Sequence, residues 1–366
     1  MSLTAGIVGL PNVGKSTLFN AITNSQVLAE NYPFATIAPN VGVVEVPDYR
    51  MDDFVKIFNP KKTIYTTFEF TDIAGLVKGA SKGEGLGNQF LGNIRQTDAI
   101  IHVVRCFDDD NIEHVEGSVD PIRDVEEINL ELAIADLDSV ENRISRIAKK
   151  AQTKDKDAMK EMETLTKFKA QLLEGKAVRL LELNDSDLEI MKNYGLLTAK
   201  PVIYVANMSD EEINDPDNNQ YYQSVKKLAE SEGSEVIAIC AKMEEELSGL
   251  DKEEKQAFLD DLGIKESGLD QIIQAAYHLL GLRTFFTVGE PECRAWTFHE
   301  GMKAPQCAGV IHSDFEKGFI KAEVYSYEDF MQYGSEKALK EAGKLRVEGK
   351  EYVMKDGDVV FFRFNV

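Results

Sequence analysis

Short apolar runs alternate with charged segments of helical periodicity along most of this sequence. Near-continuous apolar residues fill Ala99–Cys106, Val202–Ala206 and Val236–Cys240, the composition of strands that are covered on both faces of a parallel sheet. Further strands are expected at Ala5–Val8, Val41–Val46 and Thr63–Thr71. Strands that alternate with helical segments in this way predict an α/β domain built on a mainly parallel sheet.

An interruption of about 80 residues lies between Pro121 and Pro201, with no proline inside it. Apolar residues recur there at helical spacings of three, four and seven positions, in two stripes separated by the polar run 153–157. The first helix alone would be about 35 Å long at 1.5 Å per residue. We expect an antiparallel helical coiled-coil hairpin that projects from the sheet domain. Its stripes comprise Leu130, Ile134, Leu137, Ile144 and Ile147, then Met162, Leu165, Phe168 and Leu172.

The sequence changes character again after Gly281. Short β-like runs alternate with turns, one helix is expected at Tyr327–Ala342, and a strong turn signal precedes the last strand. This pattern predicts a separate α+β module of about 85 residues. Its strands are expected at Arg283–Val288, Gly318–Val324 and Val359–Phe364.

Composition and net charge argue against several classes of protein. The 366 residues carry a formal net charge of −22, which argues against a protein that coats nucleic acid non-specifically. We see no stretch of about 20 apolar residues and no signal pattern, so we expect a cytoplasmic enzyme without membrane contact. The four cysteines lack C-x-x-C pairing and are expected to be reduced thiols, and the redox role of Cys293 and Cys307 stays open.

The run Gly9–Ser16 (GLPNVGKS) has the spacing G-x-x-x-x-G-K-[ST]. It follows an apolar strand candidate and precedes a segment of helical spacing, which is the context that a phosphate-binding loop requires. Backbone N–H groups of such a loop turn toward the phosphates, and the next helix adds its positive end. Lys15 would bridge the outer phosphates, and the Ser16 hydroxyl would be a ligand of Mg²⁺. The sequence predicts a nucleoside triphosphate site.

A second motif, Asp72–Gly75 (DIAG), follows directly on a predicted strand. There the Asp72 carboxylate would reach Mg²⁺ through water, and the Gly75 N–H would sense the γ-phosphate. The loop 31–39 between the two motifs offers Thr36 as a further Mg²⁺ ligand. Thr23 and Thr63 are weaker rivals for that role.

The position after this motif is Leu76, where Ras-type enzymes have a glutamine that orients the attacking water. Hydrolysis must therefore be slow, or the water-orienting group must come from elsewhere in the chain or from a partner. Asn12 suggests one source, because an amide carbonyl at its place in the loop can bind a K⁺ ion beside the phosphates.

Base choice depends on Asn207–Asp210 (NMSD), which follows the strand Val202–Ala206. The guanine-reading motif is N-K-x-D, in which the lysine stem packs on the base and the aspartate accepts its N–H groups. Here Met208 replaces the lysine while Asp210 remains, so the residues leave ATP and GTP open. Cys240 and Ala241, at the end of the next strand, are expected to form the second wall of the base site.

Over its whole length the chain resembles the Obg-like ATPases of the YchF subfamily, on six segments. The resemblance implies a P-loop G domain (residues 1–124 and 201–280), an inserted coiled-coil hairpin (125–200) and a C-terminal TGS domain with a β-grasp fold (281–366). It also implies preference for ATP and association with the ribosome or its large subunit. The segments are Gly9–Thr17, Asn31–Asn40, Asp72–Phe90, Asn207–Asp210 and, near the C-terminus, Arg294–Thr297 with Gly309–Val324.

Motif matching to this family assigns phosphate contacts to the phosphate loop, Mg²⁺ coordination to Ser16 and Thr36, and adenine contact to Met208. Asp210 departs from the family pattern, where we expect glutamate, so dual use of ATP and GTP stays open. The residues with phosphate contacts would be Asn12, Val13, Gly14, Lys15, Ser16 and Thr17.

Three functions are compatible with these residues. The leading hypothesis is a monomeric ATPase switch that presents its hairpin and C-terminal module to the ribosome. The alternatives are a GTPase in which Asp210 reads guanine, and a scaffold that binds nucleotide without turnover, in keeping with Leu76. Basic residues of the C-terminal module could contact RNA locally, although acids among them favour a solvated face. These residues are Lys317, Lys321, Lys337, Lys340, Lys344 and Arg346.

Overall fold

The computed structural model describes residues 3–24, 40–73 and 86–365. Its contacts divide the chain into two compact units, each built from two stretches of sequence. The first unit comprises Met1–Val44 and Glu69–Ile272, and the second comprises Glu45–Phe68 and Ile273–Val366. None of the described helices is both long and apolar enough to cross a membrane.

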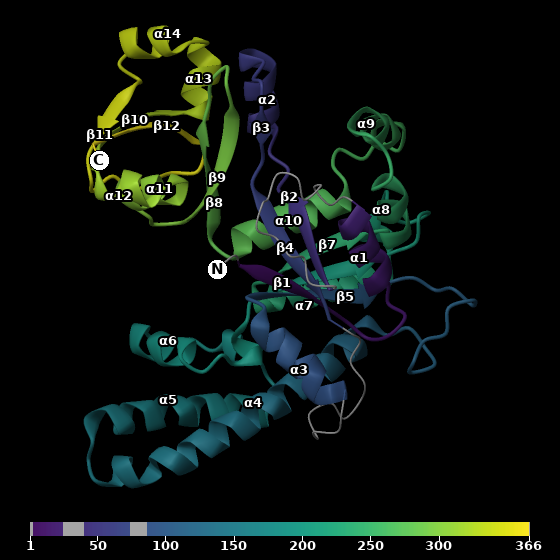
Figure 1. Cartoon of the computed structure of the whole chain (residues 1–366). Coiled ribbons are helices and arrows are strands. Elements are labelled where there is room, and N and C mark those ends of the chain that lie inside the picture. Colours follow the sequence, from purple (N-terminus) through teal and green to yellow (C-terminus); the bar gives the residue numbers. More distant parts are fainter. Residues whose placement is uncertain (1–2, 25–39, 74–85, 366) are drawn as a thin grey trace. The chain divides into compact units, whose positions relative to one another are not determined.

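The first unit is a six-stranded sheet with helices on both faces, and its strands run in the order β2-β4-β1-β5-β6-β7. Helices α1 and α8 lie on one face, whereas α3, α4 and α7 lie on the other (Figure 1). Its strands are β1 (Thr4–Val8), β2 (Val41–Glu45), β4 (Thr67–Asp72), β5 (Ala99–Arg105), β6 (Val202–Asn207) and β7 (Glu235–Ile239). Its helices are α1 (Lys15–Asn24), α3 (Leu86–Gln96), α4 (Pro121–Gln152), α5 (Lys156–Leu173), α6 (Asp185–Lys192), α7 (Gln220–Glu232), α8 (Ala241–Leu247), α9 (Lys252–Asp261) and α10 (Gly268–Leu279), the last crossing into the second unit.

The phosphate loop follows the strand at which the sheet reverses its order. Strand β1 pairs in parallel with β4 on one side and with β5 on the other, and the parallel pairing continues through β6 to β7. Ligands of open α/β sheets bind at the carboxyl ends of the strands beside such a reversal. The topology therefore places the loop after β1 where a ligand site is expected.

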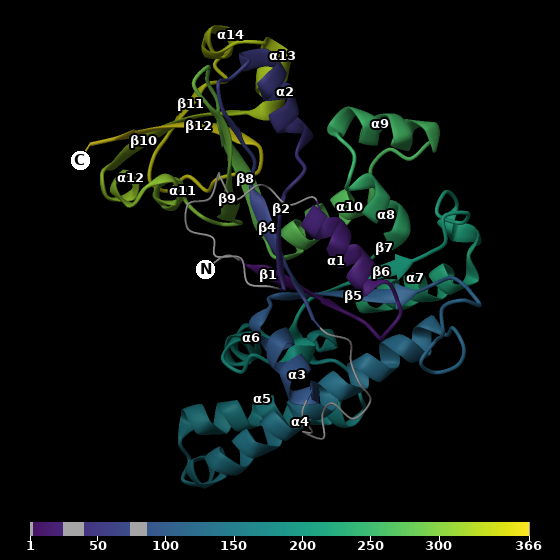
Figure 2. The ribbon, with the colours of Figure 1, turned by 45° about the vertical axis from the view of Figure 1, so that its right-hand side comes forward.

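Helices α4 and α5 form the expected antiparallel hairpin, which projects from the sheet in both views (Figures 1 and 2). Asp120 caps the first residues of α4 and Pro121 occupies its first turn, a favourable start for a helix. The 32 residues of α4 span about 48 Å at 1.5 Å per residue, longer than expected. The core between the helices includes Val140, Leu165 and Phe168, whereas Leu130 of the predicted stripe is half exposed.

Asp136 fastens the middle of α4 to the chain that enters β6. Its buried carboxylate accepts hydrogen bonds from the Leu197 N–H at 2.9 Å, from the Thr198 N–H at 2.8 Å and from the Thr198 hydroxyl at 2.7 Å. A buried carboxylate with three donors is a strong fixed point, because each donor would otherwise lie unpaired in the core. The arm is therefore joined firmly to the sheet at its base.

The second unit is another six-stranded sheet, in the order β11-β10-β12-β8-β9-β3. One of its faces packs on α11 around Phe285, Ala322 and Phe362, and the other packs on α2 and α13 around Phe54 and Phe330. Its strands are β3 (Thr63–Ile64), β8 (Leu282–Thr287), β9 (Cys293–His299), β10 (Phe319–Ser326), β11 (Arg346–Glu348) and β12 (Asp358–Phe364). Its helices are α2 (Tyr49–Phe58), α11 (Ala304–Ile311), α12 (Ser313–Lys317), α13 (Tyr327–Tyr333) and α14 (Glu336–Glu341).

Residues 45–68 pack with the C-terminal unit, which differs from the expected boundaries. The Phe54 ring contacts Phe286, Tyr327 and Phe330 with centroids 5.3, 5.5 and 5.8 Å apart. Strand β3 adds to the edge of that sheet, where Thr63 pairs with Cys293. Burial of aromatic surface is a strong driving force, and it draws this segment to the sheet of the second unit.

Two elements that were predicted to be continuous are each divided in the structure. The expected strand Thr63–Thr71 is divided into β3 and β4, which belong to different sheets. The expected helix Tyr327–Ala342 is interrupted at Gly334, which has φ +74° and ends α13. A left-handed glycine is a common helix terminator, and the second helix α14 begins again at Glu336 with Ser335 as its cap.

Candidate functional site

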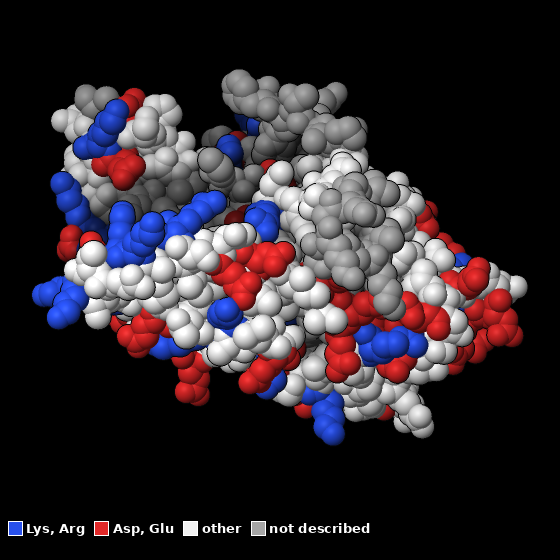
Figure 3. Space-filling view, turned by 90° about the horizontal axis from the view of Figure 1, so that it is seen from below, with Lys and Arg blue, Asp and Glu red and all other residues white. Residues whose placement is uncertain are grey.

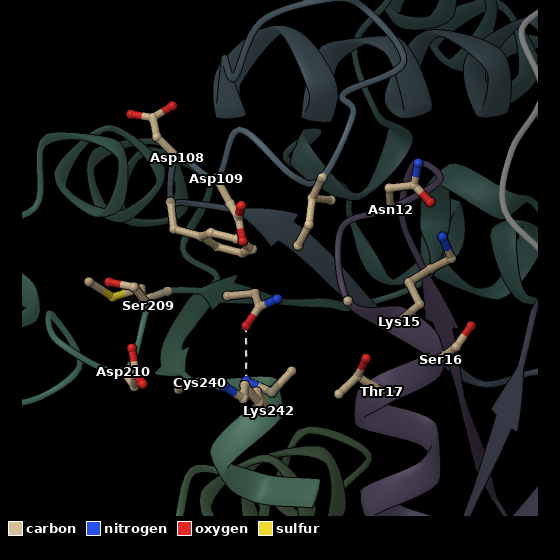
Figure 4. Close-up of a pocket in the computed structure, with 16 residues that line it drawn as sticks. Asn12, Lys15, Ser16, Thr17, Asp108, Asp109, Ser209, Asp210, Cys240 and Lys242 are labelled. Carbon is tan, nitrogen blue, oxygen red and sulfur yellow. Dashed lines mark hydrogen bonds between the residues drawn. The ribbon is translucent and has the colours of Figure 1, made fainter.

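A cavity of about 460 Å³ lies at the carboxyl ends of the parallel strands in the first unit. Figure 4 shows the phosphate-loop residues along one side of it, and Ser209, Asp210 and Asp108 opposite. The lining residues come from the loops after β1, β5, β6 and β7. They are Asn12, Gly14, Lys15, Ser16, Thr17, Phe107, Asp108, Asp109, Ile112, Asn207, Met208, Ser209, Asp210, Cys240, Ala241 and Lys242.

The phosphate loop has the tight backbone that its sequence predicts. Asn12 has φ 62° and Gly14 has φ 101°, both in the left-handed region that side chains disfavour. A Cβ atom on Gly14 would lie 2.3 Å from Nδ2 of Asn207, so only glycine fits beside that amide. Val13, which lies between Asn12 and Gly14 in the sequence, is buried. The loop is therefore held close to the end of β6.

Lys15 begins α1 and is 93% buried, its ammonium donating to the Leu10 carbonyl. Burial lowers the pKa of this lysine to about 8, and the nearby Asp72 carboxylate opposes that shift. Desolvation disfavours the charged form of a lysine, whereas a nearby anion favours it. Lys15 is thus an incompletely compensated cation at the cavity wall, suited to receive the charge of a phosphate.

Ser16 and Asp72 are the two described residues predicted to act on a metal through oxygen atoms, and Asp72 lies near Lys15 without lining the cavity. Ser16 lines the cavity with its side chain exposed, and Asp72 ends β4. Burial raises the pKa of Asp72, and Lys15 partly offsets this. A hydroxyl and a carboxylate are the ligands that Mg²⁺ prefers in phosphate sites. In the described ranges no three His, Cys, Asp or Glu side chains are clustered to hold a metal by themselves. A metal ion here would instead be coordinated partly by protein oxygens and partly by phosphate oxygens.

The Asn207 side chain connects the phosphate loop with the loop after β7. Its Nδ2 donates to the Val13 carbonyl at 2.9 Å, and its Oδ1 accepts from the Ala241 N–H at 3.0 Å. Met208 is buried beside it, and its N–H donates to the Ile239 carbonyl. Burial raises the pKa of the Cys240 thiol, so this cysteine is an apolar wall rather than a reactive group.

The loop after β5 also lines the cavity, and sequence reasoning missed it. Phe107, Asp108, Asp109 and Ile112 reach the cavity, although they belong to no motif. The available signal was their position, because they follow a buried strand of the parallel sheet at its carboxyl end.

Arg105, the last residue of β5, holds this loop in place. The residue is 99% buried, and its guanidinium donates to the carbonyls of Phe107 at 3.0 Å, Ile112 at 2.8 Å and Asp109 at 3.1 Å. It also lies over the Phe107 ring, 4.7 Å from the centroid. The planar guanidinium spreads five N–H donors over three nitrogens in a rigid fork, whereas a lysine has its three donors on a single nitrogen.

Of the predicted site residues that the structure describes, all but two line the cavity. The exceptions are Val13, which is buried behind the loop, and Asp72, which ends β4 and interacts electrostatically with Lys15. Thr36, Gly75 and Leu76 lie outside the described residues. Their expected roles in metal binding, phosphate sensing and water positioning stay predictions.

Comparison with known proteins identifies the family. A family model described as a 50S ribosome-binding GTPase matches residues 4–150, and a YchF GTPase C-terminal model, described as a protein of unknown function, matches residues 282–365. Proteins named ribosome-binding ATPase YchF are 60% identical in Bacillus subtilis (strain 168) and 53% identical in Escherichia coli O157:H7, over 100% of both chains. The chain belongs to the YchF family.

A solved YchF structure supports the same conclusion. The protein described as the Schizosaccharomyces pombe YchF GTPase is 43% identical and superposes with a TM-score of 0.88, covering 99% of this chain and 98% of that one. The family resemblance expected from the motifs is confirmed. The fold class is confirmed as well: a P-loop GTPase fold of mixed α/β type, accompanied by a C-terminal sheet domain of the TGS-like kind.

We predict that Arg105→Lys weakens nucleotide binding about tenfold or more. The three loop carbonyls bond three different nitrogens of the guanidinium, and the single nitrogen of a lysine could not occupy all three places. A carbonyl left unpaired costs roughly 1–3 kcal/mol, and tenfold corresponds to about 1.4 kcal/mol. Calorimetric titration with ATP measures the effect. Arg95→Lys, on an exposed arginine of α3, is the matched control and should bind as the wild type does. Equal affinities for all three proteins would exclude a positioning role for Arg105.

Proposed function

We propose that this protein binds and slowly hydrolyses ATP as a conformational switch that associates with ribosomes. One observation carries the proposal: a cavity formed by a phosphate-binding loop and a base-reading segment in which Met208 replaces the guanine-clamping lysine. Relatives that cover the whole chain are named ribosome-binding ATPases, which supports both parts of the proposal. We place this activity in the cytoplasm, where ribosomes are found.

Nucleotide choice follows from the residues at the base end of the cavity. Met208 offers an apolar, adaptable surface for a purine ring, and Cys240 and Ala241 supply the opposite wall. Both ends of the Asn207 amide already bond within the protein, so Asn207 acts by positioning the loops. Asp210 favours a second candidate, a GTPase, because its carboxylate is suited to the N–H groups of guanine. The S. pombe relative is itself described as a GTPase.

The reacting phosphates would lie at the other end, between Lys15, Ser16 and Asp72. Lys15 would neutralise charge on the outer phosphates, with Thr36 and Gly75 completing the site as the sequence predicts. Ser16 and Thr36 would hold Mg²⁺, with Asp72 acting through water, and the bound metal would stabilise negative charge on the phosphates. Negative charge develops on the phosphates in the transition state of hydrolysis. If no protein group neutralises all of this charge, hydrolysis would be slow.

Asn12 is oriented for an additional role. Its Nδ2 donates to the Glu113 carbonyl at 3.1 Å, and Figure 4 shows its amide oxygen turned toward the Lys15 ammonium. An amide oxygen aimed at the phosphate side of the cavity suits a K⁺ ion, which could supply charge where Leu76 cannot. This orientation supports K⁺ as a second cofactor.

The cavity also connects directly to the helical arm. The loop held by Arg105 lines the cavity and continues into α4, where His114 bonds Asp124 at 2.8 Å and Arg123 bonds the same carboxylate at 2.9 Å. A change in the loop on nucleotide binding would therefore act on the first turn of a helix about 48 Å long. We propose this path as the output of the switch.

We predict that the wild type binds ATP more tightly than GTP, and that Met208→Lys reverses the preference. The substitution restores N-K-x-D, so that a lysine stem packs on the base while Asp210 accepts from guanine. Calorimetry with both nucleotides measures the change, with Met208→Leu as a control that keeps an apolar side chain. Tight GTP binding with no detectable ATP binding by the wild type would refute the ATPase proposal in favour of the GTPase.

Hydrolysis of ATP should run faster in potassium than in sodium buffer, by about tenfold, the scale of 1.4 kcal/mol of transition-state stabilisation. Asn12→Asp should alter the ratio, whereas Asn20→Asp, at an exposed position of α1, should not. Identical rates in the two salts would remove K⁺ from the proposal and leave Mg²⁺ as the cofactor.

Ribosome association should depend on the bound nucleotide. We expect wild-type protein to sediment with ribosomes in the ATP state and to be released after hydrolysis. Lys15→Ala should abolish this dependence, because it removes the cation that faces the phosphates. Sedimentation that is identical with ATP, with ADP and without nucleotide would contradict a switch. Turnover that stays negligible with ribosomes and K⁺ present would favour the scaffold.

A further inference from the structure

We propose that the end of the helical arm is a binding surface for the phosphate backbone of folded RNA. The surface, here called the arm tip, comprises residues 146–160, where α4 ends, the chain turns and α5 begins. This inference rests on the proposed ribosome association and identifies one of its contacts. Figure 3 shows blue side chains predominating toward the left-hand end, where α4 and α5 meet, and red ones gathering on the right.

The arm tip has the opposite charge to the chain that carries it. Residues 146–160 contain six basic and two acidic side chains, in a protein of net charge −22. All six basic residues are exposed. One of the two acids, Asp155, is already engaged as the cap of α5, accepting from the Ala158 N–H at 2.9 Å. The basic residues are Arg146, Lys149, Lys150, Lys154, Lys156 and Lys160.

Ion pairing is found farther back along the hairpin. There Arg143 bonds Glu161 at 2.7 Å and Lys169 bonds Glu141 at 2.8 Å. Within the described chain, the structure records no ion pair for the six basic residues of the arm tip at 4.0 Å or less. Arg143 and Lys169 of the hairpin shaft are thus paired within the hairpin, while the cations of the tip face solvent.

Local structure explains only some of these cations. Lys149 and Lys150 lie in the last turn of α4, where a positive charge is stabilised by the helix dipole. Lys156 is in the first turn of α5, where the dipole disfavours it. Lys154 has φ +61°, a left-handed position at which glycine or asparagine would be less strained. Two lysines therefore occur where the fold itself disfavours them.

The length of the arm allows this charge to act independently. The end of α4 at Gln152 lies about 24 Å beyond Asp136, where the helix is anchored, whereas charges in physiological salt are screened within about 8 Å. The acidic body, which would repel a polyanion, is therefore screened from an anion at the tip. A polyanion can approach this surface without meeting the negative charge of the sheet domain.

The partner is better described as RNA phosphate than as an acidic protein. Protein interfaces are depleted of lysine and depend on aromatic or apolar anchors, yet the tip has no aromatic residue and Met159 is its only large exposed apolar side chain. The lack of aromatics also disfavours stacking on unpaired bases. Lysines that act as point charges suit the backbone of a duplex, which is recognised through its phosphates and shape.

The test compares two variants of the full-length protein with equal charge changes. The tip variant carries Lys149→Gln, Lys150→Gln, Lys154→Gln and Lys156→Gln. The control variant carries Lys192→Gln, Lys227→Gln, Lys252→Gln and Lys265→Gln, at positions outside both the tip and the nucleotide cavity. Binding to a fluorescein-labelled 20-base-pair RNA duplex is measured by anisotropy between 50 and 300 mM KCl, and binding to intact ribosomes by sedimentation.

We expect the tip variant to bind the duplex at least tenfold more weakly than the wild type at 100 mM KCl. The slope of log affinity against log salt should become shallower by about 0.9 for each phosphate that the variant no longer neutralises. The control variant should keep the wild-type slope. Calorimetry with ATP and the far-ultraviolet circular dichroism spectrum should be unchanged in both variants, which separates weaker RNA binding from a defect in folding or in nucleotide binding.

Each other outcome has a defined meaning. Equal affinities and slopes for the tip variant and the wild type would overturn the inference while leaving the ATPase switch intact. Loss of ribosome binding with unchanged duplex binding would overturn it in favour of a protein contact at the tip. A wild type that binds the duplex in a tip-dependent way but sediments with ribosomes in no nucleotide state would refute the proposed function and retain the RNA surface.

Discussion

The nucleotide cavity depends on one buried amide. Asn207 bonds the Val13 carbonyl and the Ala241 N–H, and so holds the phosphate loop against the loop that carries the base wall. Without it, a carbonyl and an N–H would lie buried and unpaired, at roughly 1–3 kcal/mol each. The close approach of Gly14 to the same amide shows that the loop conformation and this contact require each other. A residue expected to read the base is thus the one that assembles the site.

The first unit carries positive charge at two separate places, the nucleotide cavity and the arm tip. One positive charge lies at the cavity wall on Lys15, whose desolvation by burial is partly offset by the Asp72 carboxylate. The arm carries a separate cationic surface on an acidic protein, beyond the screening length of the body. Between them, Arg105 shapes the cavity loop and Asp136 anchors α4. Rigid joints at both places would allow a local change at the phosphates to reach a distant surface.

Much of the site could be predicted because its residues are contiguous in sequence. Gly9–Ser16 encodes its own turn through glycines, and the buried strands show as apolar runs that need no partner to be recognised. The loop at Phe107–Ile112 could not be predicted in this way, because its place in the cavity depends on Arg105 satisfying three carbonyls. No local pattern of the loop encodes that contact. The packing of residues 45–68 with the C-terminal unit could not be predicted either, because the aromatic partners of Phe54 lie more than 200 residues away in the sequence.

The sequence by itself determined the phosphate loop, the helical hairpin and the family, because these depend on spacing within short segments. Tertiary structure alone decided which sheet each strand joins, which loops close the cavity and how Asn207 is used. Those outcomes depend on pairing between distant segments, where buried polar groups must find partners and aromatic surface must be covered. The phosphate loop could therefore be recognised from eight residues, whereas the cavity that gives it a function required four loops to meet.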